Sequence, residues 1–291
     1  MNVIETHKLT KYYGKSRGII DVTLAVEEGD FFGFIGPNGA GKSTTIRTLL
    51  GLISPTGGKA EIFGLDAQRN KVAILSDVGY LPGEAAFYSG MRVKDILNLS
   101  AKLHKKDCQR EADILCQRMQ LDTQKKVETL SLGNRKKVGI VCALQHRPNL
   151  YVLDEPTSGL DPLMQREFYM ILQERNEEGA TIFLSSHVLS EVQRYCKHAG
   201  VIREGKLLVT DRVESLGHTG TKRVSLRGIT ELPRLDGVKD VKQTGDTWSF
   251  LFGGKSAELL GALSKLPIED VNIFEPDLEE VFMHYYTGEE N

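Results

Sequence analysis

A glycine-rich stretch that follows a short apolar run constrains the fold of this chain more than any other feature. It fits the pattern G-x-x-x-x-G-K-[ST] and consists of Gly36, Pro37, Asn38, Gly39, Ala40, Gly41, Lys42, Ser43 and Thr44. Glycines let backbone N–H groups turn toward phosphate oxygens, and a helix that starts at Lys42 adds unpaired donors. Lys42 supplies a compact cation for the β- and γ-phosphates, and Ser43 a hydroxyl for Mg²⁺. The stretch predicts a strand–loop–helix unit that binds a nucleoside triphosphate, a property that kinases, GTPases and motors share.

A second apolar run ends in two carboxylates. Residues 150–153 are apolar, and Asp154 and Glu155 follow them directly. A strand buried on both faces does not end in paired acids unless they serve a cation or a reaction. Asp154 is therefore expected to hold Mg²⁺ through water. Glu155 is expected to polarise a water aimed at the γ-phosphate, as a general base.

Strand-like and helical segments alternate through the first 217 residues, with a purely helical stretch between about 91 and 144. Strands are expected at 3–9, 20–26, 31–35, 59–63, 77–81, 150–153, 181–184, 201–203 and 206–210, and helices at 42–50, 93–104, 107–120 and 131–145. This alternation predicts a mostly parallel α/β core that carries a helical subdomain at about 86–149.

Beyond residue 217 the pattern changes. Strands are expected at 224–227, 238–241, 248–252 and 271–274, and helices at 256–266 and 277–286. The last helix would carry Leu278, Val281, Phe282 and Tyr285 on one face. Residues 218–291 are therefore predicted to form a small α+β accessory domain, and residues 1–217 the main domain.

Composition narrows the classes of function. The chain is 40% hydrophobic and 26% charged, with a formal net charge of −2, which argues against nucleic-acid binding through a dense basic face. No apolar stretch is long enough for a signal peptide or a membrane span. We therefore expect a cytoplasmic chain whose membrane role depends on a partner. Its four cysteines lie outside CxxC pairs and are expected to be reduced and buried.

Several segments, in a fixed order, resemble the ATPase family of ABC transporters. Residues 153–162 resemble the Walker B strand of that family running into its D-loop, and residues 130–137 are similar to its LSGGQ signature. His187 is placed like the family's switch histidine, and Tyr13 like the aromatic residue that stacks on adenine, with Tyr12 as a rival. The signature residues are Ser131, Leu132, Gly133 and Asn134, of which Leu132 and Asn134 depart from the family pattern, and the D-loop residues are Ser158, Gly159, Leu160 and Asp161.

The resemblance implies an α/β fold: a P-loop ATPase core with an antiparallel β subdomain and a helical subdomain, followed here by the small C-terminal domain. It implies that the signature, with Ser131 capping its helix, closes over ATP bound to the opposing subunit of a head-to-tail homodimer. His187 would contact the γ-phosphate and hold the attacking water. ATP and Mg²⁺ are the implied cofactors.

One departure concerns the link to the membrane. The family usually has a Gln after a strand and a proline, but here residues 78–82 are followed by Gly83. Glycine has no side chain that can bind a metal, so we expect the neighbouring Glu84 to take part of this role.

These features predict the ATP-hydrolysing subunit of an ABC transporter. It resembles bacterial drug and sodium exporters, in which the ATPase pairs with a separate permease of about six helices on the inner face of the membrane. The alternative is a soluble ABC ATPase acting on ribosomes or nucleic acid, but such proteins usually carry two ATPase domains or a long coiled coil. A small-molecule kinase would not explain the signature or the D-loop. The transported substrate is not encoded in this chain.

Overall fold

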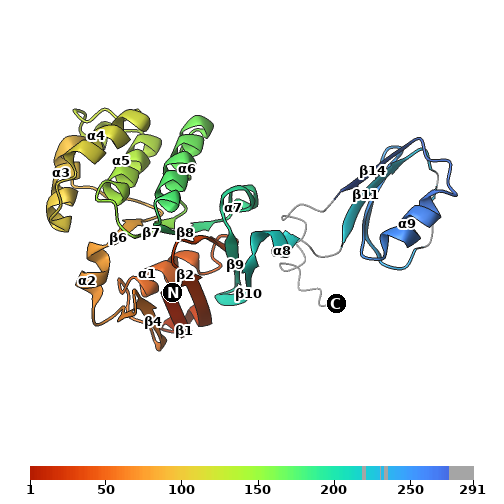
Figure 1. Cartoon of the computed structure of the whole chain (residues 1–291), viewed down its shortest axis with the longest axis horizontal. Coiled ribbons are helices and arrows are strands. Elements are labelled where there is room, and N and C mark those ends of the chain that lie inside the picture. Colours follow the sequence, from red (N-terminus) through yellow and green to blue (C-terminus); the bar gives the residue numbers. More distant parts are fainter. Residues whose placement is uncertain (218–220, 230, 233–234, 275–291) are drawn as a thin grey trace. The chain divides into compact units, whose positions relative to one another are not determined.

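The chain forms two compact units, Met1–Asp211 and Arg212–Asn291. The computed structural model describes residues 1–217, 221–229, 231–232 and 235–274. Each unit has its own hydrophobic core. Figure 1 shows the helices and strands of each unit. The division falls before the helix α8 (Val213–Gly217), whereas the domain boundary expected from sequence, between residues 217 and 218, stays a prediction.

A six-stranded sheet forms the centre of the first unit, with the strand order β10-β9-β3-β8-β7-β6. The strands are β3 (Phe31–Ile35), β6 (Val78–Leu81), β7 (Leu150–Asp154), β8 (Thr181–Ser186), β9 (His198–Arg203) and β10 (Lys206–Arg212). The pairs β9–β3, β3–β8, β8–β7 and β7–β6 are parallel. Every residue of β3, β7 and β8 is buried, and most of these residues are apolar, as expected for a sheet covered on both faces.

The strand register brings the predicted site residues to one edge of this sheet. Ile35 lies opposite Ser186, Ser185 opposite Asp154, and Leu153 opposite Leu81. The chain therefore leaves β3, β8, β7 and β6 at the same edge. Segments that are far apart in the sequence meet there, as expected at the carboxyl ends of parallel strands.

An antiparallel sheet packs over the helix that follows the glycine-rich loop. Its order is β2-β1-β4-β5, formed by β1 (Asn2–Tyr13), β2 (Ser16–Glu27), β4 (Gly57–Ile62) and β5 (Leu65–Asp66). The helix α1 (Lys42–Leu49) contacts β1, β2 and β4 as well as β7, and its Ile46 and Leu49 are fully buried. This arrangement confirms the predicted P-loop α/β core with an antiparallel β subdomain.

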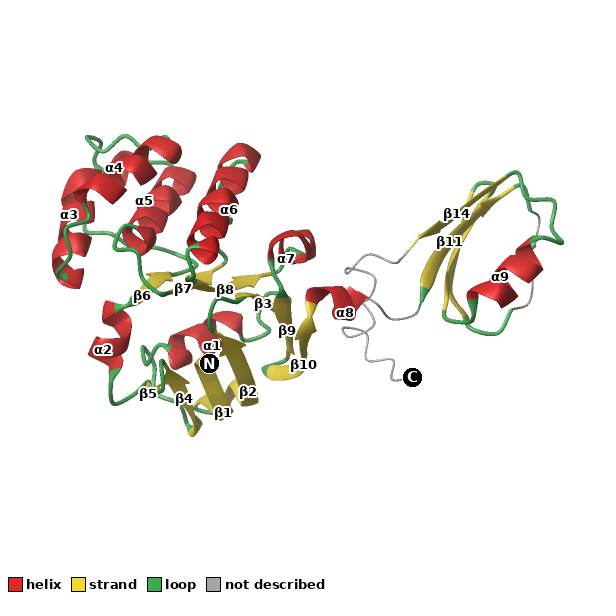
Figure 2. Ribbon diagram, viewed as in Figure 1, coloured by secondary structure: helices red, strands yellow, loops and turns green. Residues whose placement is uncertain are grey.

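Helices gather on the other side of the parallel sheet (Figure 2). They include α3 (Val93–His104), α4 (Gln109–Arg118), α5 (Leu132–Leu144) and α6 (Pro162–Glu177), with a 3₁₀ turn at Val127–Thr129; the shorter helices of this unit are α2 (Lys71–Ser76) and α7 (Leu189–Tyr195). The helix α5 contacts α3, α4 and β6. It therefore connects the helical segment to the edge strand of the sheet.

A pair of stacked histidines in this region predicts acid sensitivity. The rings of His104 and His146 lie 3.6 Å apart between centroids, and His146 is 3% exposed. Burial, then the nearby His104 and Lys106, lowers the pKa of His146 to about 4, and Asp77 only partly opposes this. An unfolded chain protonates this group near pH 6.5, so it binds more protons than the folded chain between about pH 6.5 and 4. The free energy of unfolding should therefore decrease as the pH is lowered through that window.

We expect His146→Phe, which keeps an aromatic ring, to reduce this loss of stability by about 1 kcal/mol between pH 7 and pH 5.5. Urea unfolding gives the free energy of unfolding of each protein at both pH values, and the change between the two pH values is then compared. A packing penalty of the larger ring that is the same at both pH values cancels in this comparison. The exposed His7, changed to Phe, is the matched control. Equal pH slopes for the wild type and His146→Phe would contradict the prediction.

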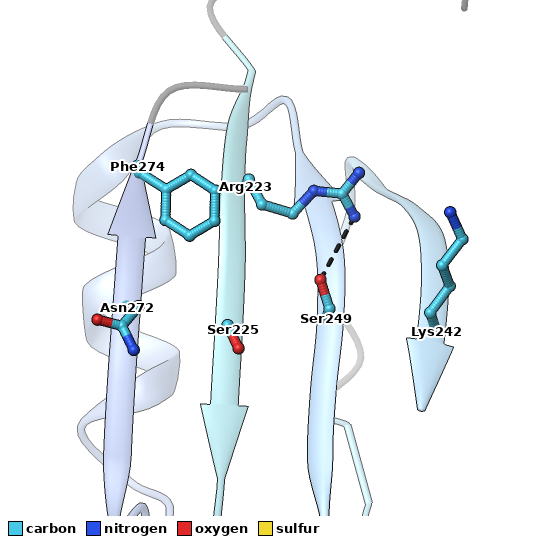
Figure 3. A pocket seen from close by; sticks show the side chains of 6 residues that line it. All are labelled: Arg223, Ser225, Lys242, Ser249, Asn272 and Phe274. Carbon is cyan, nitrogen blue, oxygen red and sulfur yellow. Dashed lines mark hydrogen bonds between the residues drawn. The ribbon is translucent and has the colours of Figure 1, made fainter. Parts of the chain in front are cut away.

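The second unit contains a four-stranded antiparallel sheet. Its order is β12-β13-β11-β14, from β11 (Lys222–Arg227), β12 (Val238–Thr244), β13 (Thr247–Phe252) and β14 (Asp270–Phe274), with the helix α9 (Ser256–Leu263). Apolar residues on one face of the sheet pack with Leu259 and Leu263 of α9. The other face is mostly polar but includes Phe274: Arg223 donates to Ser249 Oγ at 3.4 Å, in a shallow pocket that Phe274 also lines (Figure 3). The helix expected at 277–286 lies outside the described residues.

The cysteines agree with the sequence-based expectation. All four are free thiols, and Cys108, Cys116 and Cys196 are buried while Cys142 is partly buried. In the part of the chain that the structure describes, no helix is long and apolar enough to cross a membrane.

Candidate active site

The glycine-rich loop is supported by the neighbouring backbone. Gly205 N–H donates to the Ala40 carbonyl at 2.8 Å. A side chain at Gly36 would place its Cβ 2.3 Å from the Ile202 carbonyl oxygen, and Gly41 has a φ of +110°. Both positions therefore need glycine, one for close approach and one for its conformation. The loop is held in a shape in which its N–H groups can surround phosphate oxygens.

Three predicted catalytic side chains meet beside this loop. Lys42 Nζ lies 3.0 Å from Glu155 Oε1, and His187 Nδ1 lies 2.7 Å from Glu155 Oε2. Lys42 is 6% exposed and also donates to the Gly36 carbonyl at 2.6 Å. Glu155 has a φ of 46°, an uncommon conformation for a residue other than glycine. The strand β7 thus ends in a backbone turn at Glu155, whose carboxylate lies between a cation and an imidazole.

Asp154 is buried directly before Glu155, with 1% exposure. Ser185 Oγ donates to its Oδ1 at 2.7 Å and accepts from the Glu155 N–H at 3.1 Å. The other carboxylate oxygen of Asp154, Oδ2, has no hydrogen-bond partner among the described residues. Sequence reasoning gave no role to Ser185, although a hydroxyl at the end of an apolar strand is a signal for one.

The residues present fit a magnesium ion. The buried Asp154 Oδ2 and the partly buried Ser43 hydroxyl are hard oxygen donors, which Mg²⁺ prefers. Within the described residues, no group of three or more His, Cys, Asp and Glu side chains could hold a metal. A Mg²⁺ ion here would depend on water and substrate phosphates for its remaining ligands, as is usual for this metal.

The predicted signature and D-loop lie side by side. Ser131 caps α5 by accepting from the Asn134 N–H at 3.3 Å, and Leu132 is 68% exposed. A Cβ on Gly133 would come 2.5 Å from the Gly159 carbonyl oxygen, so this glycine allows close contact. No hydrogen bond or ion pair within the described ranges joins the signature to the loop at 36–44.

Asp161, predicted in the D-loop, has a structural task in this chain. Its carboxylate accepts from the Met164 N–H at 3.0 Å and caps α6, with Pro162 in the first turn. Ser158 and Gly159 are exposed, and Leu160 is 7% exposed.

Tyr13 and Tyr12 are both partly exposed at the end of β1, 48% and 39% respectively. Tyr13 lies near the end of the glycine-rich loop: its Cε2 and the Cγ2 of Thr44 are each 3.1 Å from the position of a Cβ on Gly18. The assignment of Tyr13 as the residue that stacks on a base stays a prediction.

Glu84 belongs to the turn that follows β6. Glu84 is exposed and makes no hydrogen bond or ion pair within the described part of the chain, so its proposed substitution for the usual Gln stays a prediction. Gly83 lies closer: a Cβ there would be 3.5 Å from Asp154 Oδ2.

A lysine that sequence reasoning passed over binds this turn instead. Lys136 Nζ donates to the carbonyls of Gly83 at 3.0 Å and Pro82 at 3.3 Å. Burial lowers the pKa of Lys136 to about 8, although Asp154 and Glu155 oppose the shift. The ammonium is therefore still charged at neutral pH.

Comparisons with known proteins agree with this geometry. The family model described as ABC transporter matches residues 19–158. BcrA of Bacillus licheniformis, a bacitracin transport ATP-binding protein, is 44% identical over 213 residues, which are 71% of this chain and 68% of that protein.

Solved structures show the same fold. A structure of an ATP-binding subunit of an ABC transporter superposes with a TM-score of 0.70 at 30% identity, covering 74% of this chain and 91% of its own. A dimeric structure of the ATP-binding cassette MJ0796, bound to ADP and phosphate, has a TM-score of 0.65 at 19% identity, with 72% and 98% coverage.

Proposed function

Because this chain belongs to the family of ABC transporter ATP-binding proteins, we propose that its Lys42, Glu155 and His187 hydrolyse ATP to drive transport through a separate membrane permease. The chain is the ATP-binding subunit of such a transporter and an ATPase. The observation that carries the assignment of residues is the grouping of these three side chains beside the glycine-rich loop.

In this proposal each residue of the group has one task. The loop at 36–44 surrounds the phosphates with N–H groups, and Lys42 offsets their charge. Glu155 accepts a proton from the attacking water, and His187 orients that water against the γ-phosphate. Mg²⁺, held by Ser43 and Asp154, would supply positive charge to the phosphate oxygens. Tyr13 stacks on the adenine.

A second copy of the chain completes each site in this proposal. The signature residues Ser131–Asn134 are at least partly exposed at the capped start of α5. Apart from the Asn134 N–H, which Ser131 caps, the N–H groups at this helix N-terminus suit an anion. A head-to-tail homodimer would place them over the ATP of the opposing subunit. The dimeric cassette MJ0796 is a precedent for pairing, and Gly159 would lie at the same interface because it contacts Gly133.

The membrane partner is proposed to be a permease of about six helices on the inner face of the membrane. Export is the proposed direction of transport, and the name of BcrA, a bacitracin transport protein, supports transport itself. Residues 218–291 are proposed to form an accessory domain of the ATPase, and Glu84 to contribute to the link with the permease.

Purification of the full chain from membranes tests the proposal. We expect co-purification of an integral membrane protein, and release of ADP and phosphate without a phosphorylated acceptor. A soluble ABC ATPase would instead co-purify with ribosomes or nucleic acid, and a kinase would label an acceptor. Either of those two outcomes would contradict the transporter assignment.

A further inference from the structure

A buried lysine lies in the helix α5, among buried apolar residues. Lys136, Gly139, Ile140 and Ala143 follow the spacing i, i+3, i+4, i+7, and all four are buried. Lys136 is 5% exposed. Placing an ammonium group in such a position is costly unless hydrogen bonds and opposite charges compensate for the lost water.

The compensation comes from the turn that follows β6. Lys136 Nζ donates two hydrogen bonds, both to main-chain carbonyls of this turn, Gly83 at 3.0 Å and Pro82 at 3.3 Å. Gly83 in turn lies against Asp154, since a Cβ there would be 3.5 Å from its Oδ2. Asp154 and Glu155 both favour the charged form of the lysine, so the ammonium lies within the field of the two acids.

We propose that Lys136 is a positioning residue of the ATPase: from α5 it holds the Pro82–Gly83 turn against Asp154, and its charge steadies the two acids at the end of β7. Gly83 has no side chain that could hold the turn to the carboxylate, and Glu84 is turned to solvent. The lysine does this through backbone carbonyls. The inference rests on the proposed role of Asp154 at the nucleotide.

The same lysine links two parts of the site. The helix α5 starts at the capping Ser131 and carries the signature at its N-terminus. One turn further along, Lys136 bonds the segment beside Asp154. A displacement of Asp154 would therefore be transmitted to the signature helix through the Pro82–Gly83 turn and the side chain of Lys136.

The test compares Lys136→Met, which is neutral and similar in length, with Lys136→Arg, which keeps charge and donors. Calorimetry on the full chain measures ATP affinity in Mg²⁺ and in EDTA. In Lys136→Met we expect affinity in EDTA to stay within about twofold, while the gain in affinity from Mg²⁺ falls by about tenfold. The kcat should fall by about tenfold with KM changed less than about threefold. Lys136→Arg should retain at least half of the wild-type gain in affinity from Mg²⁺ and at least half of the wild-type kcat.

Lys102→Met, an exposed lysine on α3, is the matched control and should match the wild type. If Lys136→Met does not fold, Lys136→Gln, which keeps an N–H donor without the charge, takes its place. Wild-type Mg²⁺ response and kcat in the neutral variant would overturn the inference. So would equal losses in Lys136→Arg and Lys136→Met. A wild-type chain without ATPase activity would instead refute the proposed function, and the Mg²⁺-dependent affinities would still report on Lys136.

Discussion

Glu155→Gln is expected to lower ATP turnover by about 10²- to 10⁴-fold, the largest catalytic effect of any substitution proposed for this chain. The carboxylate is the only acid in contact with both Lys42 and His187 among the described residues. An amide keeps its shape but cannot accept a proton from water. ATP affinity should persist, because the loop N–H groups and Lys42 remain. Steady-state phosphate release gives the rate.

The same variant tests dimerisation. If hydrolysis is what separates the pair, Glu155→Gln should elute as a dimer on size exclusion with ATP and Mg²⁺, and as a monomer without them. Glu28→Gln, an exposed acid outside the site, is the matched control and should behave like the wild type. Turnover at the wild-type rate in Glu155→Gln would remove this residue as the base.

The convergence of the catalytic residues could be predicted because each follows an apolar strand. The glycine-rich loop, Glu155 and His187 all lie at the carboxyl ends of strands that are predicted from apolar runs in the sequence. Parallel strands in one layer must deliver such ends to the same edge. The strand register agrees with this expectation, because it aligns Ile35 with Ser186 and Asp154 with Ser185 at the ends of the strands.

Contacts that depend on strand order could not be predicted in the same way. The bond from Ser185 to Asp154 exists because β8 lies beside β7 with this register. The expected strand ended at residue 184, two residues before the end of β8. The close approach of Gly133 to Gly159 depends on how α5 packs beside the D-loop. Neither pair has a local signature, since the partners are 31 and 26 residues apart in the sequence.

The role of Lys136 could not be predicted from the sequence. Residues 136–141 of α5 are all buried, so the spacing of apolar residues does not single out Lys136, and a lysine is usually solvated. The departure from the family pattern at Gly83 led to the prediction that Glu84, its neighbour, takes part of the role of the usual Gln. The carbonyl oxygens that Lys136 binds belong to the backbone, and sequence patterns carry no direct record of backbone contacts.

Gly36→Ala is expected to have the largest combined effect on stability and binding. The new Cβ would lie 2.3 Å from the Ile202 carbonyl oxygen and 3.0 Å from Ala40 Cβ. The obstacle is backbone of β9, the neighbour of β3, so no side-chain rotation can relieve the clash. Overpacking of this kind costs about 1–3 kcal/mol or more. Because the loop begins at this residue, the shift should also misplace its N–H groups and weaken ATP binding by at least about tenfold.

Gly57→Ala is the matched control, because the nearest atom to its added Cβ is Thr10 Cβ at 3.6 Å, an ordinary contact. Urea unfolding and ATP titration of both variants separate a steric effect from the loss of glycine flexibility. Gly57→Ala should change the free energy of unfolding by less than about 1 kcal/mol and leave ATP affinity intact. If Gly36→Ala were equally mild, the loop would not be held against β9 as the structure has it, and its fixed shape could no longer explain how the phosphates are bound.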